Sequence, residues 1–275
     1  MKGGRSAARK EILNMNIRFY QIDAFTDRVF AGNPAGVCFL DEWLDDRILQ
    51  SIAAENNLSE TAFLVPADTR YDLRWFTPKV EVDLCGHATL ASAFAVFEYI
   101  KPGAGRVDFQ TKSGQLSVER QGDLLTMDFP ARRPEPCPPP DHLAEILGIP
   151  PSQTLRARDL LVVYEEEDQV RRLQPDLERV AALEPFAVIV TAPGKNSDFV
   201  SRFFAPKVGV PEDPVTGSAH CSLIPYWSER LGKKELYALQ LSERGGELFC
   251  LNQGDRVSIG GKAVAYLSGT IQIGI

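Results

Sequence analysis

The feature that most constrains the fold of this chain is a motif that occurs twice. The segment RWFTPKVEV at residues 74–82 is repeated as RFFAPKVGV at residues 202–210, and each copy leads to a glycine that opens an apolar run, Gly86 in the first and Gly217 in the second. Repeats of roughly 20–50 residues indicate solenoids, in which each unit contacts the next one, but two copies this far apart indicate duplicated domains. We therefore expect two similar halves.

Two domains also suit the length of the chain, because 275 residues exceed what a single hydrophobic core usually supports. Between the two copies, residues 129–140 contain six prolines and few apolar residues, which is typical of a linker. We expect a disordered extension at residues 1–14, an N-terminal domain at 15–125 that a C-terminal strand could complete, and a C-terminal domain at 126–275.

Within each half the pattern is rich in strands and has one important helix. β-branched and aromatic residues predict strands at 19–25, 36–40, 61–65, 73–76, 107–111 and 116–119. Apolar residues at helical spacing, or on all sides, predict helices at 45–55, 88–100 and 219–231. The sequence therefore predicts an α+β fold in which strands wrap around one buried helix in each half.

Three local signals add detail to the second half. Pro225 should kink the helix at 219–231, because proline lacks the N–H that the helix needs. Gly232 could cap the end of that helix. Gly260 and Gly261 tolerate the positive φ angles of a tight turn, so residues 257–264 are predicted to form a hairpin.

Composition excludes several classes of partner. The net charge is −7 and Lys/Arg runs are absent from the sequence, so nucleic acid is not an expected partner. No stretch approaches the roughly 20 apolar residues that span a bilayer, so no membrane partner is expected either. The five cysteines are scattered and odd in number, which favours a reducing compartment, and we expect a cytoplasmic protein.

The two glycine turns are candidate binding elements. A helix N-terminus leaves backbone N–H groups unpaired and carries partial positive charge, and a preceding glycine lets a ligand approach the backbone. Gly86 and Ala88 in the first copy, and Gly217 and Ala219 in the second, are therefore expected to contribute backbone contacts to a substrate carboxylate. Glycine also begins helices merely because it bends the chain, so a single glycine of this kind would be weak evidence. The prediction rests on the occurrence of two such glycines at equivalent positions of the repeat.

Candidate acid–base groups cluster around these turns. His87 begins the first apolar helix, Asp213 precedes the second glycine turn, and Glu60 stands just before the apolar run at residues 62–65. A carboxylate or imidazole that faces inward at such a place can transfer protons. Each residue also has an ordinary structural explanation: a core histidine, a turn residue before Pro214, and a solvated loop acid.

Six motifs of the chain, taken together, resemble the PhzF family of phenazine biosynthesis. They follow one another in order from about Met15 to the C-terminus, and the last two are the most specific. The motifs are QIDAFT at 21–26, GNPAGV at 32–37, NLSET at 57–61, RWFTP at 74–78, CGHAT at 85–89 and EDPVTGSAH at 212–220.

The resemblance implies the diaminopimelate-epimerase fold, with two pseudo-symmetric β-barrel-like domains around central helices, as a homodimer. It implies an isomerase that uses neither a cofactor nor a metal and acts on a small-molecule carboxylate. In the phenazine enzyme the substrate is trans-2,3-dihydro-3-hydroxyanthranilate. By motif, Glu60 is the proton shuttle, and three polar side chains bind and orient the substrate: His87, Asp213 and Ser218.

Other functions stay open beside this one. Racemases and epimerases of this fold that use two thiols need a cysteine before each glycine, but Thr216 replaces the second one and cannot act as a thiolate. A zinc enzyme could be imagined from four residues, although their spacing matches no familiar site: Cys85, His87, His220 and Cys221. A binding or interaction protein that has the fold without catalysis is the remaining alternative.

Overall fold

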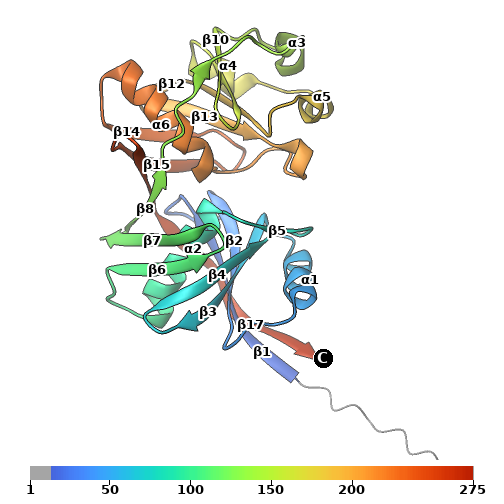
Figure 1. Ribbon diagram of the computed structural model, residues 1–275, viewed down its shortest axis with the longest axis vertical. Helices are drawn as coiled ribbons and strands as arrows, with labels where there is room; N and C mark the ends of the chain where they lie inside the picture. The colour runs from blue at the N-terminus through green and yellow to red at the C-terminus, as the bar shows by residue number, and fades with distance from the viewer. Residues whose placement is uncertain (1–13, 275) are drawn as a thin grey trace, which may run out of the picture.

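The computed structural model describes residues 14–274, so the extension expected at 1–14 lies outside the described residues except for Asn14, which begins β1. The elements form two groups, one above the other in Figure 1. The lower group contains β1 (Asn14–Ala24), β2 (Asn33–Phe39), α1 (Asp46–Asn56), β3 (Glu60–Ala67), β4 (Arg70–Phe76), β5 (Glu81–Val82), α2 (Gly86–Ala95), a π-helical turn (Val96–Ile100), β6 (Arg106–Thr111), β7 (Gly114–Gln121) and β8 (Leu124–Pro130).

The upper group follows in the sequence, and the last two strands return from it toward the lower one. The elements of the upper group are β9 (Glu135–Pro136), α3 (Leu143–Leu147), β10 (Gln153–Arg156), β11 (Leu160–Val163), α4 (Glu167–Arg172), α5 (Leu177–Ala182), β12 (Val188–Pro193), β13 (Phe199–Phe204), a 3-10 turn (Pro206–Val208), α6 (Gly217–Leu231), β14 (Glu235–Gln240) and β15 (Gly246–Asn252). β16 (Arg256–Gly261) leads back, and β17 (Ala263–Gly274) lies beside β1 in the lower group.

The strand pairing of the first half is repeated in the second. In the first half β1 and β2 are antiparallel, β2 and β3 parallel, β3 and β4 antiparallel, β4 and β6 parallel, and β6, β7 and β8 antiparallel in succession. In the second half, β10 to β16 pair in the same order and with the same directions. The predicted duplication is therefore an architectural repeat.

The two halves also share an ion pair between an arginine and a glutamate. Arg74 of β4 donates from Nε and Nη2 to the two carboxylate oxygens of Glu81, at 2.7 and 2.9 Å. Arg202 of β13 makes the same two bonds to Glu212, also at 2.7 and 2.9 Å. In the aligned motif Glu81 corresponds to a glycine, so the second half takes its acid from three residues further along the chain. Each two-point contact fixes the segment that leads to a glycine turn.

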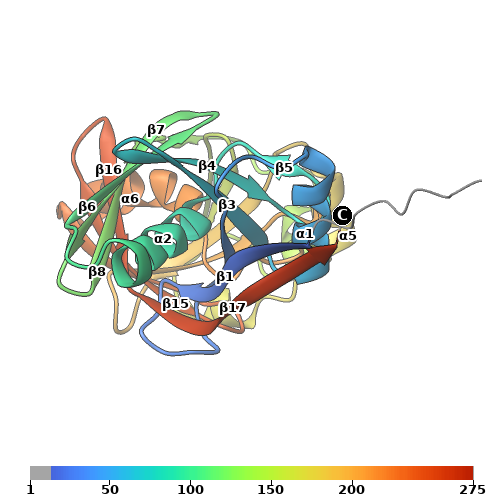
Figure 2. The ribbon, with the colours of Figure 1, turned by 90° about the horizontal axis from the view of Figure 1, so that it is seen from below.

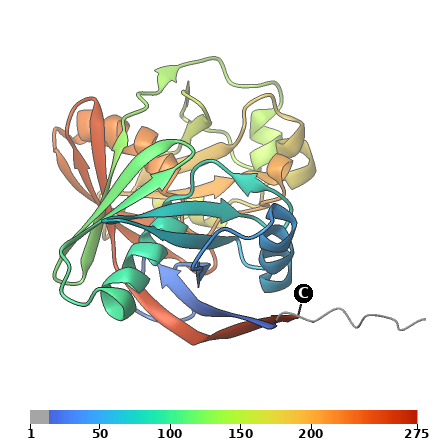
Figure 3. The same cartoon turned by 60° about the horizontal axis from the view of Figure 1, so that its bottom comes forward.

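Each half is built around one buried helix. Eight of the ten residues of α2 are buried, and Figures 2 and 3 show this helix enclosed by the curved sheet while α1 lies outside it. A helix that is apolar on nearly all sides can lie only in such an interior. α6 is buried in the same way. The expected α+β architecture of strands around central helices is confirmed.

Pro225 lies inside α6, as expected, and a linker residue makes the hydrogen bond that the proline cannot make. Proline has no N–H, so the carbonyl of Cys221, four residues earlier, cannot receive its usual helical bond. That carbonyl instead accepts a hydrogen bond from the backbone N–H of Arg132, at 2.8 Å. Gly232 ends the helix with a left-handed φ of 65°, which confirms the predicted cap.

Two expectations about elements need correction. The helix expected at 88–100 begins at Gly86, and its last turn, Val96–Ile100, is π-helical. The hairpin expected at 257–264 is wrong, because β16 pairs with β8 and β15 whereas β17 pairs with β1. Neither Gly260 nor Gly261 has a positive φ. Gly261 is needed for close packing, since a Cβ there would lie 2.4 Å from Cδ1 of Phe25.

The two halves are joined by paired strands. β8 of the first half pairs with β16 of the second, and Figure 3 shows the green and orange strands meeting along one side. β17 returns to pair with β1, side by side with it in Figure 2. The predicted division at residues 125 and 126 falls inside β8, and the two domain ranges stay a prediction. No helix within residues 14–274 is both long and apolar enough to span a membrane.

Candidate active site

The N-termini of the two central helices meet at the centre of the molecule. A Cβ atom added to Gly86, the first residue of α2, would lie 3.5 Å from Cα of Gly217, the first residue of α6. Within the described chain, no side chain caps either helix. Two partial positive charges therefore face the same region, which suits an anionic ligand.

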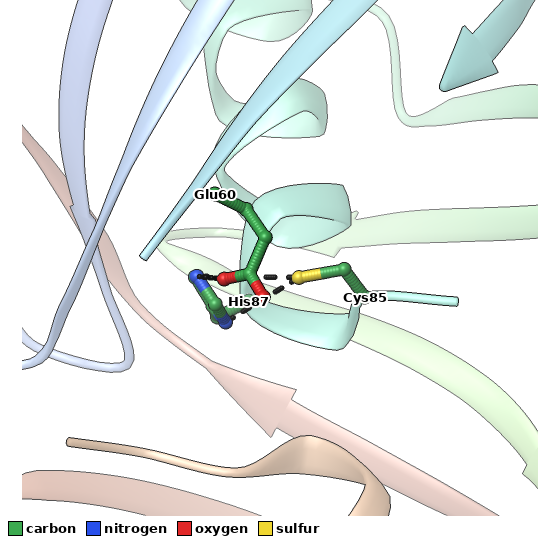
Figure 4. A group of neighbouring side chains, drawn as sticks. All are labelled: Glu60, Cys85 and His87. Carbon is green, nitrogen blue, oxygen red and sulfur yellow. Dashed lines mark hydrogen bonds and ion pairs between the residues drawn. The ribbon is translucent and has the colours of Figure 1, made fainter. Parts of the chain in front are cut away.

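Glu60 and His87 form an ion pair beside this contact. Glu60 is the first residue of β3, and its side chain is 15% exposed; His87 is the second residue of α2, with a side chain 6% exposed. The distance from His87 Nε2 to Glu60 Oε2 is 3.1 Å. Figure 4 shows the two side chains facing each other, with Cys85 beside them. Apart from His87, Oε2 has no hydrogen-bond partner among the described residues, so one of its lone pairs remains available to a reactant.

The other nitrogen of the His87 ring has neighbours of two kinds. Nδ1 lies 3.1 Å from Nδ2 of Asn33, a donor, and 3.5 Å from Sγ of Cys85, a weak acceptor. A neutral ring can accept from Asn33 at Nδ1, whereas a charged ring can donate from Nδ1 to the sulfur. His87 can therefore gain or lose a proton and still keep a partner, as an acid–base group must.

Charge around His87 favours its protonated form. Burial by itself lowers the pKa of His87, but Cys85 and Glu60 act in the opposite direction and hold the pKa well above its usual value. Of the two, we regard Glu60 as the effective cause, because burial raises the pKa of the Cys85 thiol to about 11 and keeps it neutral near pH 7. His87 therefore forms an imidazolium next to the glutamate.

Asn33 connects this pair to the second half. Its Nδ2 donates to Oδ1 of Asp213 at 2.8 Å and lies 3.0 Å from the carbonyl oxygen of Val215. Both of these neighbours are oxygens, so the amide nitrogen, not the amide oxygen, must face them. Glu60, His87, Asn33 and Asp213 thus form one continuous polar chain of close contacts across the two halves. While His87 is protonated, its Nδ1 is a neighbour of the Asn33 amide at 3.1 Å and not a hydrogen-bond acceptor for it.

Asp213 is held by its own half as well. Its Oδ2 accepts from the hydroxyl of Thr216 at 2.5 Å, and its backbone carbonyl accepts from the side chain of Gln240 at 2.8 Å. Burial raises the pKa of Asp213 to about 6, although the positive charge of His87 and the two hydrogen bonds partly oppose this. A carboxyl group of this kind can change its protonation state near neutral pH.

The other predicted site residues occupy different positions. Ser218 lies in the first turn of α6, where its hydroxyl accepts from Nη2 of Arg158 at 3.3 Å, and no contact joins it to the polar chain among the described residues. Ala88 and Ala219 are buried in the first turns of α2 and α6, so only their backbones could serve a ligand. The role given to Ser218 stays a prediction.

Two residues of this site received no role from the sequence. Asn33 belongs to the motif GNPAGV, and its place in that motif was the available signal. Gln240 ends β14. Its side-chain oxygen accepts from the backbone N–H of Thr216 at 2.8 Å, and its side-chain nitrogen donates to the backbone carbonyl of Asp213. Nothing in the local sequence distinguishes Gln240 from an ordinary strand residue.

The four-residue zinc set considered from the sequence does not gather. In residues 14–274 the metal-ligand atoms that lie within 4.8 Å of one another belong to Glu60, Cys85 and His87. His220 instead interacts through Nδ1 with the carbonyl of Thr216 at 2.8 Å. The three clustered residues could hold a metal ion only if the proton on His87 were displaced. The expectation of no metal stays a prediction.

Comparisons with known proteins identify relatives over almost the whole chain. The sequence profile described as PhzC-PhzF, phenazine biosynthesis-like protein, matches residues 22–269. An uncharacterised isomerase of Pseudomonas aeruginosa is 55% identical over 259 residues, which cover 94% of this chain and 100% of the relative. A crystal structure of a PhzF-family phenazine biosynthesis protein from Enterococcus faecalis is 45% identical with a TM-score of 0.92, and it covers 94% of this chain and 99% of that one.

A more distant structure shares the architecture. The hydroxyproline epimerase of Agrobacterium vitis, solved with bound trans-4-hydroxy-L-proline, is 11% identical with a TM-score of 0.63 over 94% of this chain and 93% of that one. At this identity the likeness shows the fold alone. It agrees with the epimerase-like architecture that the sequence motifs implied.

Proposed function

Because the chain belongs to the PhzC-PhzF family of phenazine biosynthesis-like proteins, we propose that it moves a proton between two carbons of a small carboxylate, with Glu60 as the group that carries the proton. The chain is an enzyme of the isomerase or epimerase type, as its relatives are. The proposal concerns the chemistry within that class and the residues that perform it.

One observation supports the proposal most strongly. The buried oxygen Oε2 of Glu60 lies 3.1 Å from Nε2 of the His87 ring, and apart from this ion pair it has no hydrogen-bond partner in the described part of the chain. A structural carboxylate at such a depth would usually accept further hydrogen bonds. A carboxylate oxygen whose one polar neighbour is an imidazolium keeps a lone pair free for a proton, which suits a base.

The steps follow from the charges around the site. Glu60, ionised beside His87, accepts a proton from an activated carbon of the substrate and becomes a neutral acid. It then returns that proton to a second carbon of the same conjugated system, so the enzyme ends in the state in which it began. The imidazolium of His87, 3.1 Å from the carboxyl group, orients that group during both steps.

The remaining groups serve binding. The first turns of α2 and α6 present backbone N–H groups and partial positive charge to the substrate carboxylate. Asp213, His87 and the hydroxyl of Ser218 would hold the neighbouring polar substituents. The mechanism asks for no redox or electrophilic cofactor, and we keep the small-molecule carboxylate and the homodimer as parts of this proposal.

The test is proton exchange with solvent. Wild type and Glu60→Gln are incubated in deuterium oxide with trans-2,3-dihydro-3-hydroxyanthranilate or trans-4-hydroxy-L-proline, and carbon-bound deuterium is measured by mass spectrometry. We expect incorporation by the wild type and a loss of about 100-fold or more in Glu60→Gln. Equal incorporation by the two proteins would remove Glu60 from the mechanism. Binding of a probe without any exchange would favour a non-catalytic binding protein.

A further inference from the structure

The loop between β14 and β15 reaches across to the first half through one arginine. Nε of Arg244 donates to the carbonyl of Gly32 at 2.8 Å. Nη2 donates to the carbonyl of Ala31 and to Oδ1 of Asp23, both at 2.9 Å. The guanidinium group therefore holds the loop that precedes β2 at two points and ties it to Asp23, near the end of β1.

The acceptor Asp23 makes this contact hard to replace. Its side chain is 2% exposed, and its second oxygen accepts from the backbone N–H of Phe30 at 2.9 Å. A carboxylate buried to this degree needs a cation or several donors. Arg244 supplies the cation, and its planar fork reaches the backbone carbonyls at the same time.

The same loop also supports the segment that carries Asp213. The hydroxyl of Ser242 donates to the carbonyl of Pro214 at 2.7 Å, and the carbonyl of Gly245 accepts from the N–H of Gly32 at 2.8 Å. One short loop thus contacts the residue after Asp213 and the residue before Asn33. These are the two residues whose side chains meet between the halves.

The backbone at Gly32 transmits this restraint to Asn33. Gly32 has a φ of 64°, and a Cβ there would lie 2.2 Å from the carbonyl oxygen of Ala24, so only glycine fits. Asn33 follows directly, fully buried, with its amide between His87 and Asp213. A shift of the Gly32 peptide would move that amide by a similar amount.

We propose that Arg244 is a positioning residue for the reaction: by holding Gly32, it keeps Asn33 where a single amide joins His87 of the first half to Asp213 of the second. This inference rests on the proposed function for its relevance to turnover. Its structural content, the coupling from Arg244 through Asn33 to Asp213, can be measured without any substrate.

The readout is the titration of Asp213. Five groups lie around Asp213: the charged His87 and Glu60, the polar Asn33 and Thr216, which donate to its carboxyl group, and Gln240, which donates to its backbone carbonyl. The N–H of Asn33 favours the ionised carboxylate and so lowers the pKa of Asp213 from what burial alone would produce. Displacement of Asn33 should therefore raise the pKa of Asp213 and leave the other four groups in place.

The experiment compares Arg244→Gln with Arg28→Gln. Arg28 lies on the loop that Arg244 holds, is exposed, and has no side-chain hydrogen bond or ion pair to residues 14–274. Carboxyl carbon NMR of 13C-aspartate protein follows Asp213 over pH 4–9. We expect the pKa of Asp213 to rise by half a unit or more in Arg244→Gln and to stay unchanged in Arg28→Gln. An unchanged pKa in Arg244→Gln would overturn the proposal.

A double variant separates positioning from general stability. If Arg244 acts through Asn33, then Arg244→Gln combined with Asn33→Ala should have the same Asp213 pKa as Asn33→Ala alone. Additive shifts would contradict the proposal. Should Arg244→Gln fail to fold, Arg244→Lys keeps a charge near Asp23 but loses the fork to Gly32, and the same rise is expected. With a probe that the wild type turns over, kcat of Arg244→Gln should fall about tenfold together with the shift in the Asp213 pKa. If the pKa shifts but the wild type turns over no probe, the result counts against the proposed function and not against the role of Arg244.

Discussion

The first turns of α2 and α6 occupy matching places in the two halves, yet only one of them carries an acid–base pair. In the first half, His87 lies 3.1 Å from the carboxylate of Glu60, and its pKa is well above the usual value. In the second half, His220 lies in the same region of α6, and burial lowers its pKa to about 4. The duplication provides the scaffold twice, but the described residues place a glutamate beside a histidine only in the first half.

The difference between the two histidines has a simple physical cause. Both are buried, which disfavours the charged ring. His87 has an anionic neighbour that reverses the effect, whereas His220 has the backbone carbonyl of Thr216 on Nδ1, and its Nε2 is without a hydrogen-bond partner among the described residues. The two histidines are not equivalent in the repeat, because His87 aligns with Ser218 and His220 stands two residues further along. What distinguishes His87 is the charged partner that β3 brings to it, Glu60.

The comparison predicts its largest effect on activity. His87→Gln should lower deuterium exchange into a turned-over probe by about 100-fold, since the variant loses the ion pair that orients Glu60. His220→Gln should stay within about threefold of wild type. Mass spectrometry of the exchanged probe provides both rates, with circular dichroism as the control for folding. Equal losses in the two variants would mean that the halves share the chemistry.

The second prediction concerns how the free energy of unfolding depends on pH. The two histidines should change this dependence in opposite directions. His87 has a raised pKa in the folded state, so its contribution is fully present below about pH 6.5 and is lost as pH rises through that folded value. His220 has a folded pKa of about 4, so the unfolded chain binds the proton first and stability falls as pH drops from about 6.5 to about 4, by up to roughly 3 kcal/mol.

Urea unfolding at a series of pH values checks this prediction. His220→Gln should flatten the acidic side of the stability curve, and His87→Gln should flatten the alkaline side. The exposed His142 provides a control, because His142→Gln should leave both sides unchanged. If both buried variants flattened the same side, the assigned charge states would be wrong.

The smallest predicted effect concerns the repeated arginine pairs. Arg74→Lys and Arg202→Lys each lose the two-point contact to a glutamate, and each should destabilise the protein by about 1–3 kcal/mol. Both arginines also donate from Nη1: Arg74 to the exposed Asp46 at 2.9 Å, and Arg202 to the carbonyls of Val170 and Leu173 at 3.2 and 2.8 Å. Arg202 should lie at the upper end, because a carbonyl of a buried residue left without its donor costs more than an exposed carboxylate. Thermal unfolding measures both. A lysine tolerated at only one of the two positions would show that the repeat has diverged there.

The duplication made much of the fold predictable from the sequence. A motif at residues 74–82 that returns at 202–210 implies that the strands around it return as well, and the pairing orders agree. The predicted hairpin failed for a definable reason. Two adjacent glycines permit a tight turn, but they equally permit close packing, and Phe25 lies against Gly261 only in the folded molecule.

The site could be predicted only in part. Motifs indicated Glu60, His87 and Asp213, and the structure brings these three together. Asn33 was missed as the link between them, because its contact with Asp213 joins residues 180 positions apart and has no local pattern. The hydrogen bonds of Arg244 to the first half were missed for the same reason, because Arg244 and Asp23 lie 221 positions apart in the sequence.

The most direct test of the account is a crystal structure with 3-hydroxyanthranilate, a stable carboxylic acid. The account predicts that its carboxylate binds at the first turns of α2 and α6 and that a ring carbon lies within roughly 3.5 Å of Glu60. A hollow of about 300 Å³ elsewhere, lined in part by Arg133, Tyr226 and Arg230, offers an alternative place. If the acid bound only there and the Glu60–His87 pair stayed undisturbed, the proposed site would be contradicted.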